Sequence, residues 1–359
     1  MTAVAELALD TEGDSLHHYP ERLALLQVGL PGGAVWLVDP LALDDLGTLA
    51  PVFADAGRRL LLHAGDNDLV HLKRRYAFRF ASVFDTAIAA RFLGGRALGL
   101  DVLLETYLEV RLPPSRQKDD WSVRPLTDAQ VTYAAADVLH LFALAARLRE
   151  ELERAGRLAW VEEECAALAA QPAPERAVDP DAYLRVKGAR ELTDRQRAVL
   201  RALWERRETL ARAADRPPFK VLGEDALLRL AQAAPRDAAE LAAVPGLTPR
   251  AIARWGPAIL DAVAAGLAVD DAEVPRLERR PRPVVPGAVS RRIEALRRWR
   301  GEAAERYGLD PGVLLPNRLI AAIGHAGPRG LEQLAGVDGV RRWRVETFGR
   351  EILAAISGA

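Results

Sequence analysis

Four acidic residues and one tyrosine, spread over the first half of the chain, could together hold metal ions. Asp10 and Glu12 end an apolar run, and alternate side chains of a strand point to the same face. Tyr133 and Asp137 are four residues apart in a helical stretch, so they share one helix face, and Asp68 lies at the start of another predicted helix. Carboxylates that converge repel one another unless cations lie between them, and Mg²⁺ and Mn²⁺ prefer oxygen ligands. Two such ions could activate a water molecule and stabilise the leaving oxygen of a phosphodiester.

A mixed sheet flanked by helices is predicted to position these residues. Apolar runs predict strands at residues 4–9, 23–28, 35–38, 59–63 and 80–84, and helical spacing predicts helices at 43–53, 67–76 and 85–92. Pro31-Gly32-Gly33, between the second and third runs, predicts an antiparallel connection. From residue 98 to about 168 the pattern is mostly helical, with breaks at Pro113-Pro114 and around Pro125. Strands followed by helical layers indicate an α/β domain.

The rear half of the chain is predicted to contain two all-helical blocks that repeat one another. Four pairs of landmarks recur at offsets of 95, 92, 93 and 93 residues, namely Trp204 and Trp299, Leu227 and Leu319, Leu241 and Leu334, Arg254 and Thr347. Composition shifts place the domains at residues 1–170, 191–268 and 290–359. The linkers between them span residues 171–190 and the Pro/Arg-rich residues 269–289.

Composition and charge narrow the class of protein. Half of the residues are apolar and the net charge is −1, but residues 1–150 carry 15 Lys/Arg against 20 Asp/Glu while the remainder carries 34 against 30. An acidic front half suits a cation site, and a basic rear half suits a polyanion. The single Cys165 excludes a disulfide framework and is predicted to be a buried small hydrophobe. Without a signal-peptide pattern, an uncharged apolar run of about 18 residues or an oligomerisation element, we expect a cytoplasmic monomer that does not span a membrane.

The acidic residues occur within longer motifs. Their order is Asp10-x-Glu12, then His63-Ala-Gly-x-x-Asp68, then Tyr133-x-x-x-Asp137, and this order resembles the DEDD 3′–5′ exonucleases of the tyrosine subclass. Further segments are similar to the ribonuclease D family: Tyr19-Pro20 with Leu25-Leu26-Gln27, Phe84-Asp85-Thr86, and Gln117-Lys-Asp-Asp-Trp121-Ser-x-Arg124-Pro-Leu. The two helical blocks resemble HRDC domains, so that the resemblance covers nearly the whole chain.

The resemblance implies a fold and a reaction. The fold would be a ribonuclease H-like mixed sheet followed by two HRDC-like helical bundles. Asp10, Glu12, Asp68 and Asp137 would hold two metal ions, Mg²⁺ or Mn²⁺, and Tyr133 would orient the attacking water or help to take its proton. Hydrolysis would release nucleoside 5′-monophosphates from RNA with a single-stranded 3′ end. Precursor transfer RNA and other stable RNAs are the substrates that the family implies.

Several other residues of these motifs are candidates for substrate binding, and each has a structural alternative. His63 could contact substrate, or it could pack and hydrogen-bond at a strand end. Trp121 could stack on a base, or it could belong to the core, and Arg124 could touch phosphates or lie in solvent. Asp85 could support the site, although an N-cap is the preferred interpretation. The remaining candidates are Tyr19, Gln27 and Gln117.

Two features bear on how RNA is held. Gly13-Asp14-Ser15 follows Glu12 where the family often has a bulky residue, so the resemblance does not identify the residues that grip the terminal base. Residues 276–300 contain nine arginines and two glutamates, and this stretch could contact phosphates without regard to base sequence or could simply be solvated. Two rival functions are a DNA-trimming exonuclease with the same site, and a non-catalytic nucleic-acid scaffold. A scaffold would be indicated by the loss of a metal ligand, and none of the five positions is substituted.

Overall fold

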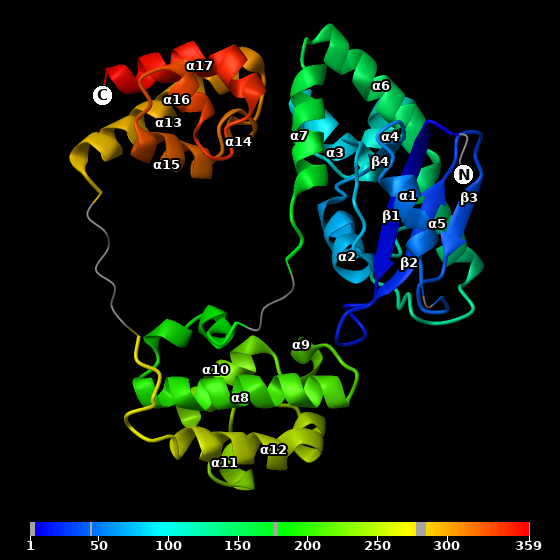
Figure 1. The fold of residues 1–359 in the computed structure, drawn as a ribbon. Coiled ribbons are helices and arrows are strands. Elements are labelled where there is room, and N and C mark those ends of the chain that lie inside the picture. Colours follow the sequence, from blue (N-terminus) through cyan, green and yellow to red (C-terminus); the bar gives the residue numbers. More distant parts are fainter. Residues whose placement is uncertain (1–3, 44, 175–178, 278–284, 359) are drawn as a thin grey trace. The chain divides into compact units, whose positions relative to one another are not determined.

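Five strands form one mixed sheet in the computed structural model, which describes residues 4–43, 45–174, 179–277 and 285–358. The strands are β1 (Glu6–Gly13), β2 (Leu23–Gly29), β3 (Val35–Val38), β4 (Arg59–Leu62) and β5 (Val83–Asp85), in the order β3-β2-β1-β4-β5 (Figure 1). β4 is parallel to both β1 and β5, whereas β2 and β3 are antiparallel. Gly32 and Gly33 both have φ above +90°, which is why glycines occupy that turn. The predicted mixed sheet is confirmed.

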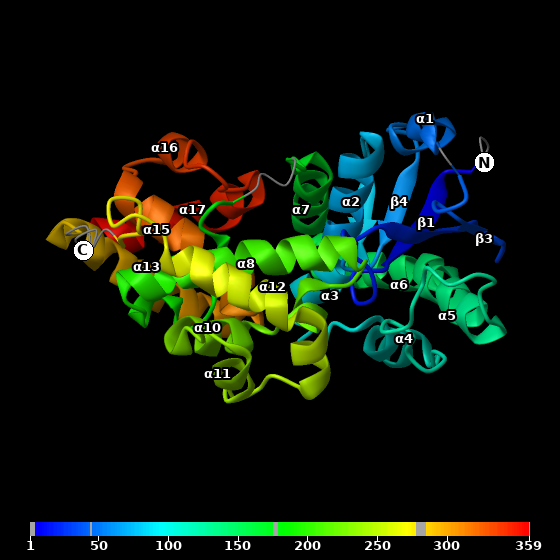
Figure 2. The ribbon, with the colours of Figure 1, turned by 90° about the horizontal axis from the view of Figure 1, so that it is seen from below.

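Helices cover both faces of the sheet because the strands are apolar on both sides. One face, with Leu7 and Leu9, packs against α1 (Ala50–Phe53), α2 (Asp66–Tyr76) and the end of α7 (Leu158–Ala170). The other face packs against α3 (Thr86–Phe92), α5 (Asp128–Leu139) and α6 (Leu141–Arg154) (Figure 2). The chain passes from α3 to α5 through α4 (Leu100–Leu108) and an irregular segment that contains Pro113-Pro114. Each face of the sheet therefore has its own core.

Two predicted elements are shorter in the structure than the sequence indicated. The helix expected at 43–53 is limited to a 3₁₀ turn (Gly47–Leu49) and α1, because Asp45 accepts the backbone N–H of Gly47 and turns the chain before α1, which has Pro51 in its first turn. The strand expected at 80–84 is limited to 83–85, because Phe80 packs its ring 5.6 Å from that of Phe53 instead of pairing with a strand. Neither of these two elements contains any of the four acidic residues or the tyrosine first identified from the sequence.

Helix α5 lies close against the sheet at Gly29. A Cβ atom at position 29 would be 3.1 Å from Cβ of Ala8 and 3.3 Å from Cβ of Val138. The helix begins with a reciprocal cap, in which Thr127 accepts from the backbone of Gln130 while the Gln130 side chain accepts from the backbone of Thr127. The absence of a side chain at Gly29 therefore sets how near α5 comes to β1.

By length and composition alone, residues 128–154 taken as one helix could cross a membrane. Half of that window is buried within the protein. This stretch comprises α5 and α6, whose apolar residues face the sheet and whose helix α5 carries Tyr133 and Asp137. Its apolar character is that of a core helix packed against a sheet.

The chain divides into two compact units. The first contains residues 1–12, 23–175 and 283–359, and the second contains residues 13–22 and 176–282. Parts of both predicted linkers, residues 175–178 and 278–284, lie outside the described residues, and with them three arginines of the basic stretch. The predicted domain boundaries remain predictions.

The second helical module, residues 285–358, belongs to the first unit. It consists of α13 (Gly287–Tyr307), α14 (Pro311–Leu314), α15 (Asn317–Ala326), α16 (Leu331–Ala335) and α17 (Arg342–Ser357). Helix α17 packs on α7, where the rings of Trp160 and Trp343 are stacked 4.6 Å apart. Beside this stack, Arg344 lies 2.6 Å from Glu164 in a mostly buried ion pair. The module therefore shares one hydrophobic core with the nuclease sheet.

The first helical module, residues 191–268, lies in the second unit and has a core of its own. It contains α8 (Asp194–Ala213), α9 (Pro218–Val221), α10 (Glu224–Ala233), α11 (Ala238–Ala242) and α12 (Pro249–Leu267), preceded by two 3₁₀ turns (Ala182–Arg185 and Ala189–Glu191). Helices α9 to α12 begin 93 residues before α14 to α17, respectively. The predicted internal repeat is confirmed.

Candidate active site

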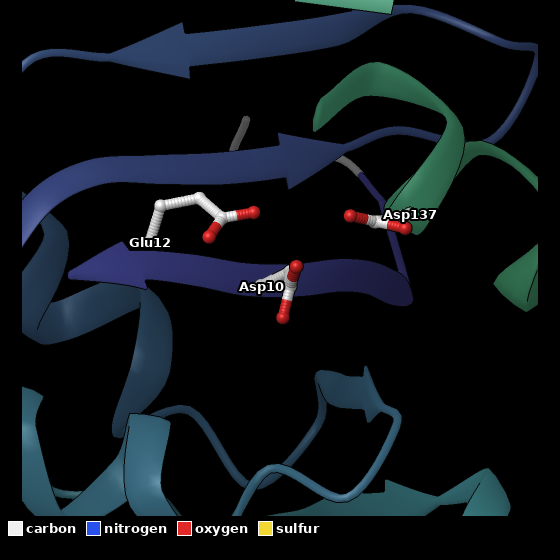
Figure 3. Close-up of side chains that lie close together, drawn as sticks. All are labelled: Asp10, Glu12 and Asp137. Carbon is white, nitrogen blue, oxygen red and sulfur yellow. The ribbon is translucent and has the colours of Figure 1, made fainter. Parts of the chain in front are cut away.

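Three carboxylates meet on one face of the sheet. Asp10 and Glu12 extend from β1, and Asp137 approaches from α5 (Figure 3). One oxygen of each lies within 4.8 Å of the others. Strand alternation places the first two together, and the close approach of α5 at Gly29 brings the third to them. We call these three residues the acidic group.

Burial and crowding disfavour the ionised forms of the carboxyls in the acidic group. Burial, and then the neighbouring Asp137 and Asp68, raise the pKa of Glu12 to about 8. Burial raises the pKa of Asp137 to about 7, and burial together with the surrounding carboxylates holds the pKa of Asp10 well above its usual range. Without cations these carboxyls therefore retain protons at a pH where isolated carboxyls are ionised.

Asp68 completes the set from the first turn of α2. The register of β1 and β4 pairs Ala8 with Leu61, so that Asp10 and the residues after it extend beyond the end of β4, where α2 begins. Burial raises the pKa of Asp68, while a hydrogen bond donated by the Thr11 hydroxyl opposes this shift. Thr11 was not predicted as a site residue, because a threonine in a strand carries no signal of such a role.

A buried aspartate shapes the turn that delivers Asp68. Asp85 is almost fully buried and caps α3 by accepting the backbone N–H groups of Ala87 and Ile88, which confirms the predicted N-cap. Its two carboxylate oxygens also accept the backbone N–H groups of Ala64 and Gly65, at 3.2 and 2.9 Å. The four hydrogen bonds to the Asp85 carboxylate hold the segment between β4 and α2 against the start of α3. They thereby fix the position of Asp68 in the first turn of α2.

Tyr133 lies one helical turn before Asp137 on the same face of α5. Its hydroxyl is hydrogen-bonded to the Asp137 carboxylate and to the side chain of Ser115. Burial, followed by the nearby carboxylates of Asp137 and Glu12, raises the pKa of the phenol further above its usual value, so Tyr133 is neutral at physiological pH. Ser115 was not singled out from the sequence, since it lies in an irregular segment without periodicity.

These residues line one cavity of about 780 Å³. It brings together the acidic group, Asp68 and Tyr133, and its wall also contains His63 and Gln117. The wall is completed by Leu98, Gly99, Leu100 and Asp101 before and at the start of α4, and by Leu112, Pro113, Pro114 and Ser115 after it. The five residues first identified from the sequence therefore converge on one space that is open to solvent.

The two further candidates in the cavity wall differ in exposure. His63 is partly buried, its Nδ1 lies 2.9 Å from the Thr86 hydroxyl, and burial lowers its pKa, so a neutral imidazole is favoured. The packing and hydrogen-bonding alternative therefore describes His63 in this structure, although its ring also faces the cavity. Gln117 is exposed at the rim and can be reached by a ligand.

The other four candidates lie outside this cavity wall. Trp121 is fully buried and packs 6.1 Å from the ring of Tyr133, as the core alternative predicts. Arg124 holds Asp39 through Nε at 2.6 Å and Nη2 at 2.8 Å, and also donates to the backbone of β2. Gln27 is fully buried. The fourth, Tyr19, belongs to the second unit, where its hydroxyl donates to Glu208.

The donor set fits divalent cations. Carboxylate oxygens are the ligands that Mg²⁺ and Mn²⁺ prefer, and three of them come within 4.8 Å of one another. Among the residues that the structure describes, no Lys, Arg or His side chain contributes to the pKa values of Asp10, Glu12 and Asp137, which are raised, and a bound metal ion would supply the missing positive charge. The described residues offer no Cys-rich alternative, since the one cysteine, Cys165, is buried elsewhere as predicted.

Comparisons with known proteins agree with this arrangement. The sequence matches the 3′-5′ exonuclease family over residues 1–153 and the HRDC domain family over residues 196–263 and 290–356. Ribonuclease D of Pseudomonas paraeruginosa is 35% identical over 360 residues, which cover 98% of this chain and 92% of the relative. Ribonuclease D of Acidiphilium cryptum is 33% identical over 356 residues, covering 98% of this chain and 88% of the relative.

A solved structure shows the same fold over nearly the full length. Escherichia coli RNase D, described as an exoribonuclease involved in structured RNA processing, is 27% identical with a TM-score of 0.69. The match covers 99% of this chain and 94% of that chain. The predicted ribonuclease H-like sheet, followed by HRDC helical modules, is confirmed.

Proposed function

The chain belongs to the ribonuclease D family and is a 3′–5′ exoribonuclease, and we propose that two divalent cations, Mg²⁺ or Mn²⁺, support its reaction on precursor transfer RNA and other stable RNAs. The observation that carries this proposal is the convergence of the acidic group, Asp68 and Tyr133 on one cavity. The product would be a nucleoside 5′-monophosphate and a shortened RNA. We further propose that the protein acts as a cytoplasmic monomer.

Asp10, Glu12, Asp68 and Asp137 would hold the cations. When bound, these ions would lower the pKa of a water molecule and stabilise the negative charge that develops on the phosphate and the leaving oxygen. The carboxylates that now retain protons would release them, because a nearby cation favours the ionised form. The cost of crowding the carboxylates would thus be offset only in the loaded protein, which ties the integrity of the site to cation binding.

Tyr133 would orient the attacking water. Its phenol stays neutral because burial and the adjacent carboxylates raise its pKa. A neutral hydroxyl donates a hydrogen bond and is a poor base, so of the two roles that the family implies, orientation is the one this environment favours. Ser115 and Asp137 hold the hydroxyl on the cavity side, where the reacting phosphate would enter.

The decisive experiment incubates a 3′-tailed RNA with the native chain and Mg²⁺ or Mn²⁺, and follows its shortening from the 3′ end. Asp10→Asn should lose about 10³-fold or more in rate, because a ligand of the cations is lost at the point where charge develops. Asp128→Asn, an exposed acid on the helix that carries Asp137, is the matched control and should keep its rate. No shortening by the native chain would end the proposal, and a matched DNA strand measures how far the site discriminates the sugar.

We also propose that the arginines of α13 hold the body of the RNA. Arg297 and Arg298 are exposed on this helix, at the end of the basic stretch noted in the sequence. Arg297→Gln with Arg298→Gln should weaken binding uniformly across RNA sequences and reduce the salt dependence by about 0.7 per lost phosphate contact. Arg329→Gln with Arg350→Gln removes the same charge from exposed positions elsewhere in the module and is the control. Equal binding by the two double variants would contradict a specific role for α13.

A further inference from the structure

Gln27 is a buried polar side chain with no visible purpose in the packing of the core. It lies on β2 and is fully buried. Among the residues that the structure describes, neither its Oε1 nor its Nε2 has a hydrogen-bond partner. Buried amide groups in folded proteins nearly always have partners, and one left unpaired reduces stability. A glutamine in this place needs a function that compensates for that cost.

Gln27 lies beside the acidic group. β2 runs antiparallel to β1 (Figure 3), and Gly29 on β2 lies next to Ala8 on β1, since a Cβ at position 29 would be 3.1 Å from that of Ala8. Two residues back along β2 is Gln27, and two residues on along β1 is Asp10. Because alternate residues of a strand share a face, Gln27 and Asp10 are neighbours on the same side of the sheet.

Helix α5 covers Gln27 from above. On one side of it along β2, Gly29 meets Val138, and on the other side Leu25 packs with Tyr133 and Ala134. Gln27 therefore lies beneath the turn of α5 that carries both Tyr133 and Asp137. Complete burial prevents contact with RNA, so the substrate-binding role considered from the sequence does not suit it.

We propose that Gln27 is a positioning residue of the cation site, whose side-chain amide donates to the Asp10 carboxylate when that carboxylate holds a cation. The inference rests on the proposed two-cation function. An amide has two N–H donors, and an ionised carboxylate offers more acceptor positions than a bound cation occupies. Hydrogen bonds to metal ligands fix the orientation of those ligands, and their loss typically weakens metal binding by about 10- to 100-fold.

A rival explanation is that Gln27 serves only the core. Within the described part of the chain, the indole Nε1 of Trp121 is also buried without a hydrogen-bond partner. Trp121 belongs to the cluster that contains Leu25 and Tyr133, so the carbonyl of Gln27 could pair with this indole after a rearrangement. In that case removal of the amide would lower the stability of the protein and leave cation binding unaffected. The two explanations therefore predict opposite changes.

The test measures Mn²⁺ binding to the full chain by titration calorimetry, with no RNA present. Gln27→Met keeps the length of the side chain and removes its donors, while Leu25→Met is the control on the same strand and face. We expect Gln27→Met to bind Mn²⁺ about 10-fold more weakly, with an unchanged or higher melting temperature in EDTA. The control should bind as the native chain does. Equal Mn²⁺ affinity of Gln27→Met and the native chain overturns the inference.

A second measurement keeps the inference testable if Gln27→Met does not fold. In the native chain, the assigned side-chain amide of Gln27 should shift and exchange its hydrogens more slowly when Mg²⁺ saturates the site, and unchanged resonances would contradict the proposal. Failure of the native chain to bind Mn²⁺ would remove the two-cation function and this inference together. Native binding without any effect at Gln27 would remove the inference alone, so the two failures are distinguishable.

Discussion

The last four helices of the two helical modules begin at the same spacing, but the N-terminus of the final helix is capped differently in each module. In the first helical module, α12 is capped by its own Thr248, whose side chain accepts the backbone N–H of Ala251. In the second helical module, α17 has no such cap of its own. There, Glu163 of α7 accepts the backbone N–H groups of Arg342 and Trp343, at 2.7 and 2.9 Å. The nuclease domain thus supplies a part that the second module lacks.

The counterparts of the docking residues show the same difference. At the 93-residue spacing, Trp343 and Arg344 correspond to Arg250 and Ala251 of the first helical module. Trp343 is buried against Trp160, whereas Arg250 is exposed. The second helical module shares a hydrophobic core with the nuclease domain, and the first helical module has a separate core. Deleting a module is therefore a test of RNA binding for the first and a test of folding for the second.

The largest effect should come from removing the second helical module. Truncation after residue 284 exposes Trp160 and Phe92 and leaves the mostly buried Glu164 without Arg344. We expect the remaining nuclease domain to melt about 10 °C lower or to precipitate, because several kcal/mol of packing and ion pairing are lost. Residues 176–282 alone should melt cooperatively, since the core of the first helical module is its own. Circular dichroism measures the melting of the truncated chain and of residues 176–282. An unchanged melting temperature of the truncated chain would contradict the difference between the two modules.

A single docking residue gives the next largest effect. Trp343→Ala should lower the free energy of unfolding by about 3 to 5 kcal/mol, because a buried aromatic ring in contact with Trp160 and Phe348 is removed. Its counterpart change, Arg250→Ala, should stay within about 0.5 kcal/mol because that side chain is exposed. Urea unfolding of the two variants makes the comparison. Similar losses in both would mean that the two helices contribute alike.

The two units should also differ in their response to pH and Mg²⁺. The pKa of Glu12 is raised to about 8 and that of Asp137 to about 7, so the folded first unit keeps protons that its unfolded chain releases. The contribution of these carboxyls to stability in EDTA should therefore be greatest below about pH 4, where the unfolded chain also keeps the protons, and should fall by about 2 kcal/mol or more between about pH 4 and pH 8. Mg²⁺ should restore it, most of all at alkaline pH. Calorimetry should show no Mg²⁺ effect on residues 176–282, and a shift there would contradict the assignment of the cation site.

The smallest effect concerns the two caps. Glu163→Gln should cost about 0.5 to 1 kcal/mol, because the anionic cap at the start of α17 is lost. Thr248→Ala should cost about 1 kcal/mol for α12. The difference lies in which unit responds, the first for Glu163 and the second for Thr248. Amide hydrogen exchange of α12 and α17, measured on both variants, shows which helix each substitution destabilises. Faster exchange of α12 in Glu163→Gln, or of α17 in Thr248→Ala, would contradict these assignments of the two caps.

Four of the five residues first identified from the sequence were signalled by local periodicity. Asp10 and Glu12 are separated by the strand period, and Tyr133 and Asp137 by one helical turn. The mixed sheet and the 93-residue repeat followed from apolar runs and landmarks in the same way. Such signals depend on residues a few positions apart or on a regular repeat. Both kinds of signal can be recognised without knowledge of long-range contacts.

What the sequence could not show depends on contacts between distant segments. Thr11 donates to Asp68 across 57 positions, and Glu163 caps a helix that begins 179 positions later. Trp121 was a candidate for base stacking, with a place in the core as the favoured alternative, and its complete burial decides for the core. Nothing local distinguishes a glutamate that caps a distant helix from one in solvent. The sequence of the second helical module alone therefore does not predict that this module shares its core with the nuclease domain.

The missing side chain at Gly29 bears on the spacing of the proposed cation ligands. Asp137 is carried toward Asp10 by a helix whose height above the sheet is limited by the contact of Gly29 with Ala8 and Val138. One added methyl group would have to lift α5 by a few tenths of an ångström. Ligand distances are about 2.0–2.1 Å for Mg²⁺ and about 2.3–2.6 Å for Ca²⁺, a difference of similar size. We therefore expect the contact of α5 with β2 at Gly29, a residue outside the cavity wall, to influence which of these ions fits between Asp10 and Asp137.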